Sequence, residues 1–101
     1  MAKTLEPGDI VERYRVETQL GEGGVAVVYR VRHTELMTVH ALKLLRWDHP
    51  RLRERLLREG RLQAGLRHRN VVAVTDVLEV HDSPALLMDF VPGGTLQELL
   101  A

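Results

Sequence analysis

Apolar and polar residues alternate over several short stretches of this chain, and one longer stretch follows a different period. Alternation at every second position is typical of strands with one buried face. The alternating stretches are rich in β-branched and aromatic residues, and turn-forming residues bound them. We therefore predict five strands, at residues 14–20, 26–33, 37–45, 71–80 and 85–91.

Residues 51–67 instead have the period of a helix. Leu52, Leu56, Glu59, Leu62 and Leu66 recur at spacings of three and four, so they lie on one stripe. Pro50 suits the first turn of this helix, with Asp48 or His49 near its cap. Glu59 lies on the same apolar stripe, where an ionised carboxylate needs a cation or strong hydrogen bonds. Gly60 and Gly65 each weaken the helix by up to about 1 kcal/mol, so tertiary packing must hold it.

The two ends of the chain have weaker patterns. Residues 1–13 form a polar lead-in with a Pro-Gly turn signal. Thr95 caps the start of a second helix, with Glu98 three residues later as in a capping box. We expect one domain at residues 14–101, because a chain of 101 residues can build a single small core.

Composition narrows the function classes. The chain is 45% hydrophobic and 28% charged with a net charge of zero, which is typical of a globular protein and suggests no nucleic-acid partner. It contains no cysteine, so disulfides and thiolate metal sites are excluded. No apolar run reaches the roughly 18 residues of a membrane span, and the N-terminus lacks the core of a signal peptide. We therefore expect a cytoplasmic protein.

Charge is unevenly spread along the chain. Residues 46–69 contain eight arginines, and no lysine or arginine follows residue 69. The simplest interpretation of this basic block is the solvated face of one helix. A phosphate- or peptide-binding patch is the alternative.

The five histidines have no helical i,i+4 spacing, so we expect no metal site. Trp47 is expected to pack between the third strand and the helix.

A glycine-rich loop lies between the first two predicted strands. Gly21 and Gly23 are two apart, and the small residue Ala26 follows three positions later. Glycine lets backbone amides approach a bulky anion, so such a loop can wrap the phosphates of a nucleotide. Because the loop joins two strands of a hairpin, it is not a dinucleotide-binding turn, which would lead into a helix. It is not a Walker A loop either, because no Gly-Lys-Ser/Thr triplet follows.

Lys43 stands out because the chain has twelve arginines and only two lysines. It lies in the middle of an apolar strand, and a compact ammonium suits phosphate oxygens in a narrow site. The alternative is a lysine that extends its charge to water from a strand edge. Glu59 needs a cation and Lys43 needs an anion, and their elements are consecutive. We therefore predict that the two residues pair.

These motifs together resemble the protein kinase family, specifically the eukaryotic-like serine/threonine kinases of bacteria. Residues 20–29 are similar to the glycine-rich loop, and residues 40–43 to the motif that carries the strand-three lysine. Glu59 is placed like the glutamate of helix C. Residues 66–72 resemble the linker that follows helix C, and residues 86–96 resemble strand five, the hinge and the start of helix D. The resemblance implies an α+β fold, the N-terminal lobe of a kinase, with a five-stranded antiparallel sheet and one main helix.

The resemblance also implies a role for each matching residue. Lys43 would contact the α- and β-phosphates of ATP and pair with Glu59. The resemblance assigns the other nucleotide contacts to three groups: the loop residues Gly21, Glu22, Gly23, Gly24, Val25 and Ala26; the adenine-facing Leu20, Val28 and Ala41; and the gatekeeper Met88 with the hinge residues Asp89 and Val91. Mg²⁺ would enter only as its ATP complex.

Three positions depart from the pattern of the family. Ala26 replaces the third glycine, His40 the usual valine, and Arg69 the usual proline of the linker. We expect the side chain of His40 to face away from Lys43. The chain also contains no His-Arg-Asp catalytic loop, no Asp-Phe-Gly motif and no activation segment, which supply the catalytic base and hold Mg²⁺.

The resulting hypothesis is a fragment or truncated product that binds ATP weakly without turnover and would phosphorylate a protein only with a C-lobe. A rival hypothesis is a non-catalytic interaction module that forms homodimers through the face that would otherwise meet the C-lobe. A third is a polyanion binder that uses the helix arginines.

Overall fold

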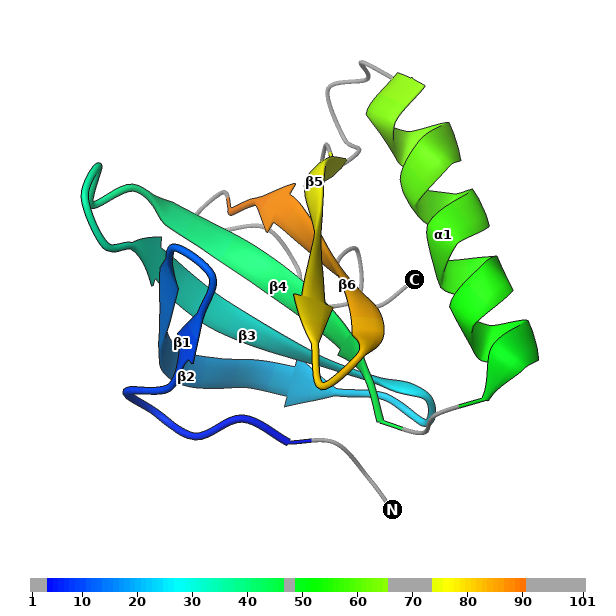
Figure 1. Ribbon diagram of the computed structural model, residues 1–101, viewed down its shortest axis with the longest axis horizontal. Helices are drawn as coiled ribbons and strands as arrows, with labels where there is room; N and C mark the ends of the chain where they lie inside the picture. Colours follow the sequence, from blue (N-terminus) through cyan, green and yellow to red (C-terminus); the bar gives the residue numbers. More distant parts are fainter. Residues whose placement is uncertain (1–3, 47–48, 66–73, 91–101) are drawn as a thin grey trace.

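The structure is a computed structural model that describes residues 4–46, 49–65 and 74–90, without the side chains of residues 62–65. The elements in chain order are β1 (Ile10–Val11), β2 (Tyr14–Glu22), β3 (Ala26–His33), β4 (Val39–Leu45), α1 (Pro50–Gly65), β5 (Val74–Val80) and β6 (Ser83–Asp89). Figure 1 shows a curled sheet with α1 at one side, where it packs against β5 and β6. The expected α+β class and single main helix are confirmed.

The sheet has six antiparallel strands in the order β1-β2-β3-β4-β6-β5, one more than the predicted five. The additional strand, β1, comes from the segment that the sequence indicates as a polar lead-in. Leu5 and Val11 of this segment are buried, and the amide of Leu5 donates a hydrogen bond to the hydroxyl of Tyr29 at 2.9 Å. Two apolar side chains therefore attach the N-terminal segment to the core.

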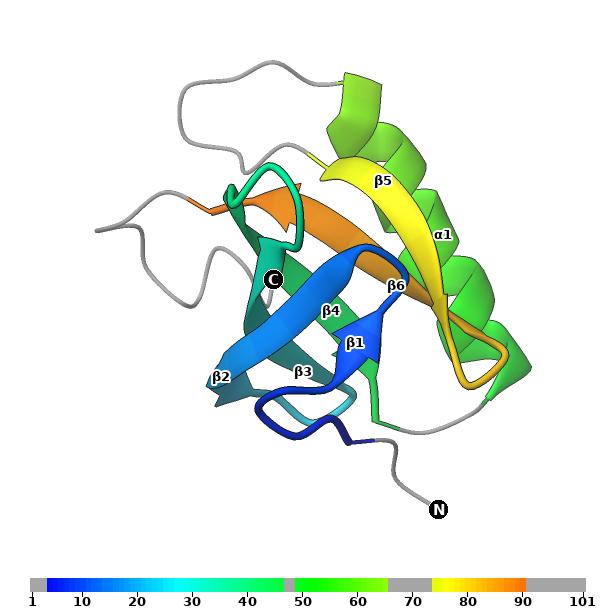
Figure 2. The same cartoon turned by 60° about the vertical axis from the view of Figure 1, so that its left-hand side comes forward.

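The curl of the sheet creates two separate apolar clusters. The first contains residues from all six strands and fills the space that the curled sheet encloses (Figure 2). The second lies between the sheet and α1. Successive residues of β4 alternate between them: Leu42 and Leu44 belong to the first cluster, and Ala41 and Leu45 to the second. The two faces of this strand therefore belong to different clusters.

Two strands begin at positions other than those predicted. β4 begins at Val39 rather than residue 37, because Met37 has a positive φ of 61° and its amide donates to the carbonyl of His33 at 2.9 Å. β6 begins at Ser83 rather than residue 85, because His81 and Asp82 have φ values of 50° and 65°. Two consecutive residues with positive φ make a tight hairpin turn.

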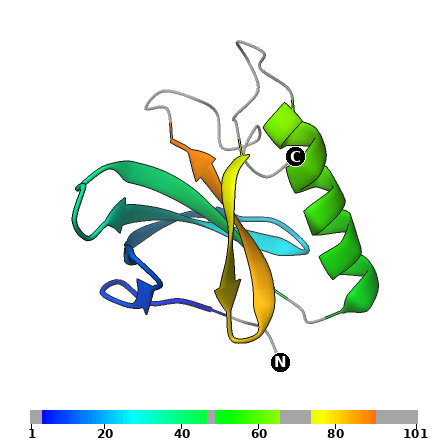
Figure 3. The same ribbon diagram turned by 45° about the horizontal axis from the view of Figure 1, so that its top comes forward.

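Helix α1 begins as the capping pattern predicts. The ring nitrogen Nδ1 of His49 accepts a hydrogen bond from the amide of Arg51 at 3.2 Å, and Pro50 is the first helical residue. Gly60 faces Leu86 so closely that a Cβ atom at this position would lie 2.8 Å from Cδ2 of that leucine. The glycine that weakens the helix thus allows it to approach the sheet (Figure 3).

Several expectations lie outside the described residues. They concern Trp47 and Asp48, the linker at residues 66–72, the first residues of the strand predicted at 71–80, and everything from Val91 onward, including the second helix. In the part of the chain that the structure describes, no helix is long and apolar enough to cross a membrane.

Candidate functional site

The glycine-rich loop is the tip of the hairpin formed by β2 and β3. Glu22 is paired with Val27, and the amide of Gly23 donates to the carbonyl of Ala26 at 2.8 Å. This amide closes the hairpin, so in this conformation it is not directed at a ligand. Gly24 and Val25 remain at the exposed tip of the loop.

Lys43 lies in the middle of the sheet. Its strand, β4, runs between β3 and β6, where Lys43 is paired with Val28 on one side and Leu86 on the other. Only 5% of its surface is exposed. A cation in such a position requires an anionic partner, because burial of an unpaired charge is costly.

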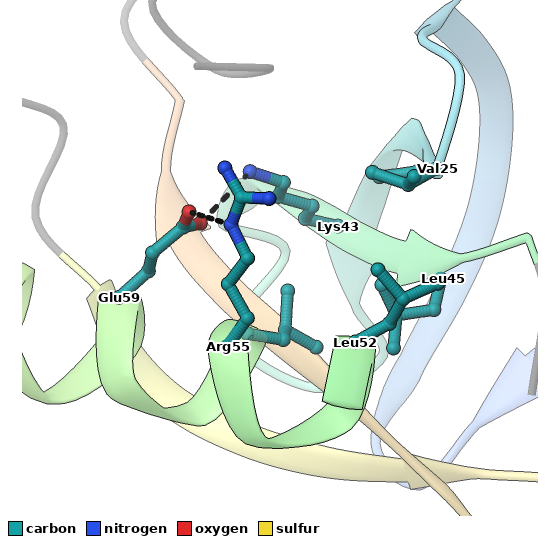
Figure 4. A pocket seen from close by; sticks show the side chains of 8 residues that line it. Val25, Lys43, Leu45, Leu52, Arg55 and Glu59 are labelled. Atoms are coloured by element: carbon teal, nitrogen blue, oxygen red, sulfur yellow. Dashed lines mark ion pairs between the residues drawn. The ribbon is translucent and has the colours of Figure 1, made fainter. Parts of the chain in front are cut away.

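The carboxylate of Glu59 supplies that partner. Its Oε2 lies 3.6 Å from Nζ of Lys43, and its Oε1 lies 3.6 Å from Nε of Arg55 (Figure 4). The structure thus joins the two residues that the sequence pairs. Arg55 was missed, although its position one helical turn before Glu59 is a recognisable signal for an i,i+4 ion pair.

These charged groups line one end of a small cavity between the loop, β4 and α1. The cavity has a volume of about 100 Å³, and it is lined by Val25, Ala26, Lys43, Leu45, Leu52, Arg55, Leu56 and Glu59. Pockets for whole small-molecule ligands usually measure about 300–1,000 Å³. With two cations and one carboxylate at a mainly apolar wall, this cavity suits part of an anion rather than a whole nucleotide.

The residues predicted to contact adenine also gather in one place. Val28, Ala41 and Met88 belong to the apolar cluster beside α1, and Leu20 and Phe90 pack against it. Val28 and Ala41 have no exposed surface in this conformation. Asp89 is exposed at the end of β6. The structure brings these residues together, but a base could reach Val28 and Ala41 only after they are uncovered.

An ion-pair network lies near the same cluster. Glu17 binds Nε of Arg30 at 2.9 Å and Nε of Arg32 at 2.8 Å, and the Arg30 guanidinium lies 5.7 Å from the ring centroid of Phe90. The hydrogen bond from Arg32 lowers the pKa of the Glu17 carboxyl, against a smaller opposing effect of burial. Sequence alternation alone does not reveal this network, because its members come from two strands, β2 and β3, and from the residue that follows β6.

His40 lies beside the ring of Tyr14, with ring centroids 5.3 Å apart. Tyr14 belongs to the cluster inside the curl, so His40 faces away from Lys43. Its Nε2 lies 2.8 Å from the hydroxyl of Thr38, and its buried Nδ1 has no hydrogen-bond partner among the residues that the structure describes. Burial lowers the pKa of His40; the negative charge of Asp89 opposes this effect, and His33 adds to it.

Comparison with known proteins agrees with this architecture. Residues 14–101 match the family described as "Protein kinase domain". The chain is 37% identical to serine/threonine-protein kinase PknJ of Mycobacterium tuberculosis, covering 99% of this chain and 18% of that protein. It is 34% identical to serine/threonine-protein kinase PrkC of Bacillus subtilis, covering 87% of this chain and 14% of that protein. The chain thus spans less than a fifth of the length of these two relatives.

Solved structures agree in fold. The crystal structure of the Mycobacterium tuberculosis PknI kinase domain is 30% identical with a TM-score of 0.68, covering 87% of this chain and 37% of that domain. The apo form of PpkA-294 superimposes with a TM-score of 0.75 at 22% identity, which is evidence of the fold alone. The chain therefore belongs to the protein kinase family and has the fold of the N-terminal lobe of a kinase domain.

Proposed function

We propose that this chain is the ATP-binding lobe of a serine/threonine protein kinase. The observation that supports this proposal best is the environment of Lys43, which is 5% exposed and pairs with Glu59 below the glycine-rich loop. A purely structural lysine would be expected to place its ammonium in water. Here the ammonium lines a cavity, where it can meet an anion.

The phosphates would bind between the loop tip and β4. Lys43 would contact their oxygens as a compact point charge, and Glu59 would hold the ammonium in place. Arg55 shares the carboxylate of Glu59 and lines the same cavity, so it adds positive charge at the entrance. Because Gly23 uses its amide to close the hairpin, Gly24 and Val25 are the loop residues best placed to donate amides. ATP would arrive as its magnesium complex.

The base would lie against the second apolar cluster. Leu20, Val28, Ala41 and Met88 offer the apolar surface that a flat base requires, and the backbone of Asp89 and Val91 would bind its edge. Val28 and Ala41 are fully covered, so binding requires a conformation in which they are exposed. The apparent affinity falls by the fraction of molecules in that conformation. We therefore expect weak binding by this chain alone.

Phosphoryl transfer to a protein belongs to the complete kinase in this proposal. None of the 101 residues forms a His-Arg-Asp or Asp-Phe-Gly motif, so this chain by itself has no group of either kind to act as base or to hold the metal. We expect nucleotide binding without turnover. The serine/threonine specificity is inferred from the relatives alone.

Calorimetric titration of Mg²⁺-ATP into the chain tests the proposal. Lys43→Met should weaken binding at least tenfold while the far-ultraviolet circular dichroism stays unchanged. Arg58→Met is the matched control, because Arg58 is an exposed cation of the same helix that does not line the cavity. Equal binding by the Lys43→Met variant would contradict the proposal. A folded, self-associated chain that binds no ATP at millimolar concentration would support the interaction module instead.

A further inference from the structure

Arg46 directly follows β4 and reaches three positions of the glycine-rich loop. Its amide donates to the carbonyl of Val25 at 2.8 Å. Its Nη1 donates to the carbonyl of Gly23 at 3.3 Å and lies 3.7 Å from Oε2 of Glu22. One residue outside the loop therefore holds both sides of its tip, through one backbone contact and two side-chain contacts.

Among the described residues, the tip of this loop is loosely packed. A Cβ atom placed on Gly24 would find no other atom within 4 Å, and 46% of the surface of Val25 is exposed. A loosely packed loop must lose backbone entropy when a ligand orders it. Contacts that order the loop beforehand reduce that cost and so strengthen binding.

We propose that Arg46 is a positioning residue that orders the glycine-rich loop before the nucleotide binds. The effect of Arg46 on nucleotide binding rests on the proposed function. The contact between Arg46 and the loop can be tested without a ligand. The guanidinium binds a carbonyl and a carboxylate of the loop, so it leaves the amides at the tip unused. Its action on the nucleotide is indirect, through the position of the loop.

Hydrogen exchange of the Gly23 amide in the ligand-free chain reports on the loop directly, because this amide closes the hairpin. Arg46→Met keeps a long apolar side chain and the backbone contact but removes the guanidinium. We expect exchange of this amide to become at least fivefold faster, with the melting temperature nearly unchanged. Arg46→Lys, which keeps the charge next to Glu22, should give an intermediate rate.

Arg53→Met is the matched control. Nη2 of Arg53 donates to the carbonyl of Asp82 at 2.7 Å, so it makes a similar contact to a different hairpin turn. We expect this variant to change Gly23 exchange by less than twofold. An unchanged rate in Arg46→Met, or an equally faster rate in Arg53→Met, would overturn the proposed contact.

Titration of Mg²⁺-ATP then tests the positioning role. We expect Arg46→Met to weaken binding three- to tenfold and Arg53→Met to leave it unchanged. Faster Gly23 exchange with unchanged affinity would overturn the positioning role. Failure of the unsubstituted chain to bind ATP would instead overturn the proposed function, and the exchange experiment would still decide whether Arg46 holds the loop.

Discussion

Oε2 of Glu59 on α1 lies 3.6 Å from Nζ of Lys43 on β4, and this ion pair links the helix to the centre of the sheet. The side chain of Lys43 is 7% exposed and that of Glu59 is 33% exposed, so the pair is protected from solvent mainly on the lysine side. Removal of the carboxylate therefore leaves a buried ammonium without this anionic partner.

We predict that Glu59→Gln lowers the free energy of unfolding by about 1–2 kcal/mol, because the loss of a partner leaves a buried charged group poorly satisfied. The control is Glu54→Gln, an exposed carboxylate on the same helix, which should change stability by less than about 0.5 kcal/mol. Urea unfolding monitored by circular dichroism measures both. In the Lys43→Met background, Glu59→Gln should lower the free energy of unfolding by a smaller amount. An equal loss in both backgrounds would show that the ion pair does not couple α1 to β4.

Gly60→Ala should destabilise the protein although alanine favours a helix. Alanine gains up to about 1 kcal/mol in helix propensity, but overpacking a filled core costs about 1–3 kcal/mol. The new Cβ would lie 2.8 Å from Cδ2 of Leu86, a fully buried side chain that would have to shift. We expect a net loss of about 1 kcal/mol in urea unfolding.

A shorter side chain at the contact should relieve this effect. The double variant Gly60→Ala with Leu86→Val should lose less free energy of unfolding than the sum of the losses in the two single variants. Arg61→Ala is the control, since Arg61 is an exposed neighbour on the helix and should change stability by less than about 0.5 kcal/mol. A more stable Gly60→Ala variant would refute the close approach of α1 to β6.

The pKa of His40 predicts how stability depends on pH. Burial holds the folded pKa of His40 below its usual value of 6.5, so the unfolded chain binds this proton more readily. The contribution of neutral His40 is therefore fully present above about pH 6.5 and is lost as the pH falls below it. Urea unfolding at pH 7.5 and 5.5 should give the lower stability at pH 5.5.

The His40→Val variant isolates this effect from the other four histidines. It should lose less stability between pH 7.5 and 5.5 than the unsubstituted chain. The lowered pKa of Glu17 acts in a different window, because its contribution is lost only as the pH falls below about 4.5. An identical pH dependence in both proteins would mean that protonation of His40 is not linked to folding.

The turn between β5 and β6 offers a stabilising substitution. Asp82 has a φ of 65°, in the left-handed region that glycine adopts without strain. We expect Asp82→Gly to raise the free energy of unfolding by about 0.5–1 kcal/mol. Asp76→Gly in β5 is the matched control and should lower stability by a similar amount, since glycine inside a strand is unfavourable. Thermal unfolding distinguishes the two variants. A loss of stability in both would contradict the left-handed backbone conformation of Asp82 in this turn.

Local periodicity was sufficient for most elements of the fold. Alternation predicted β3 at residues 26–33, and the leucine spacing predicted α1. The rarity of lysine and the carboxylate on an apolar stripe were enough to pair Lys43 with Glu59. The elements depend on side chains a few residues apart, and the pair depends on the need of each buried charge for a partner of opposite charge. Both can be recognised in the sequence alone.

The tertiary structure decided what depends on contacts between distant segments. The positive φ values of Met37, His81 and Asp82 moved the starts of two strands, because the backbone of a turn also depends on hydrogen bonds that residue types alone do not specify. Leu5 and Val11 enter the core only because the curled sheet brings the N-terminal segment against it. The sequence alone therefore determined most of the elements and the pairing of Lys43 with Glu59, whereas burial of the residues predicted to contact adenine and the contacts of Arg46 with the loop arise from the curl and the packing of α1.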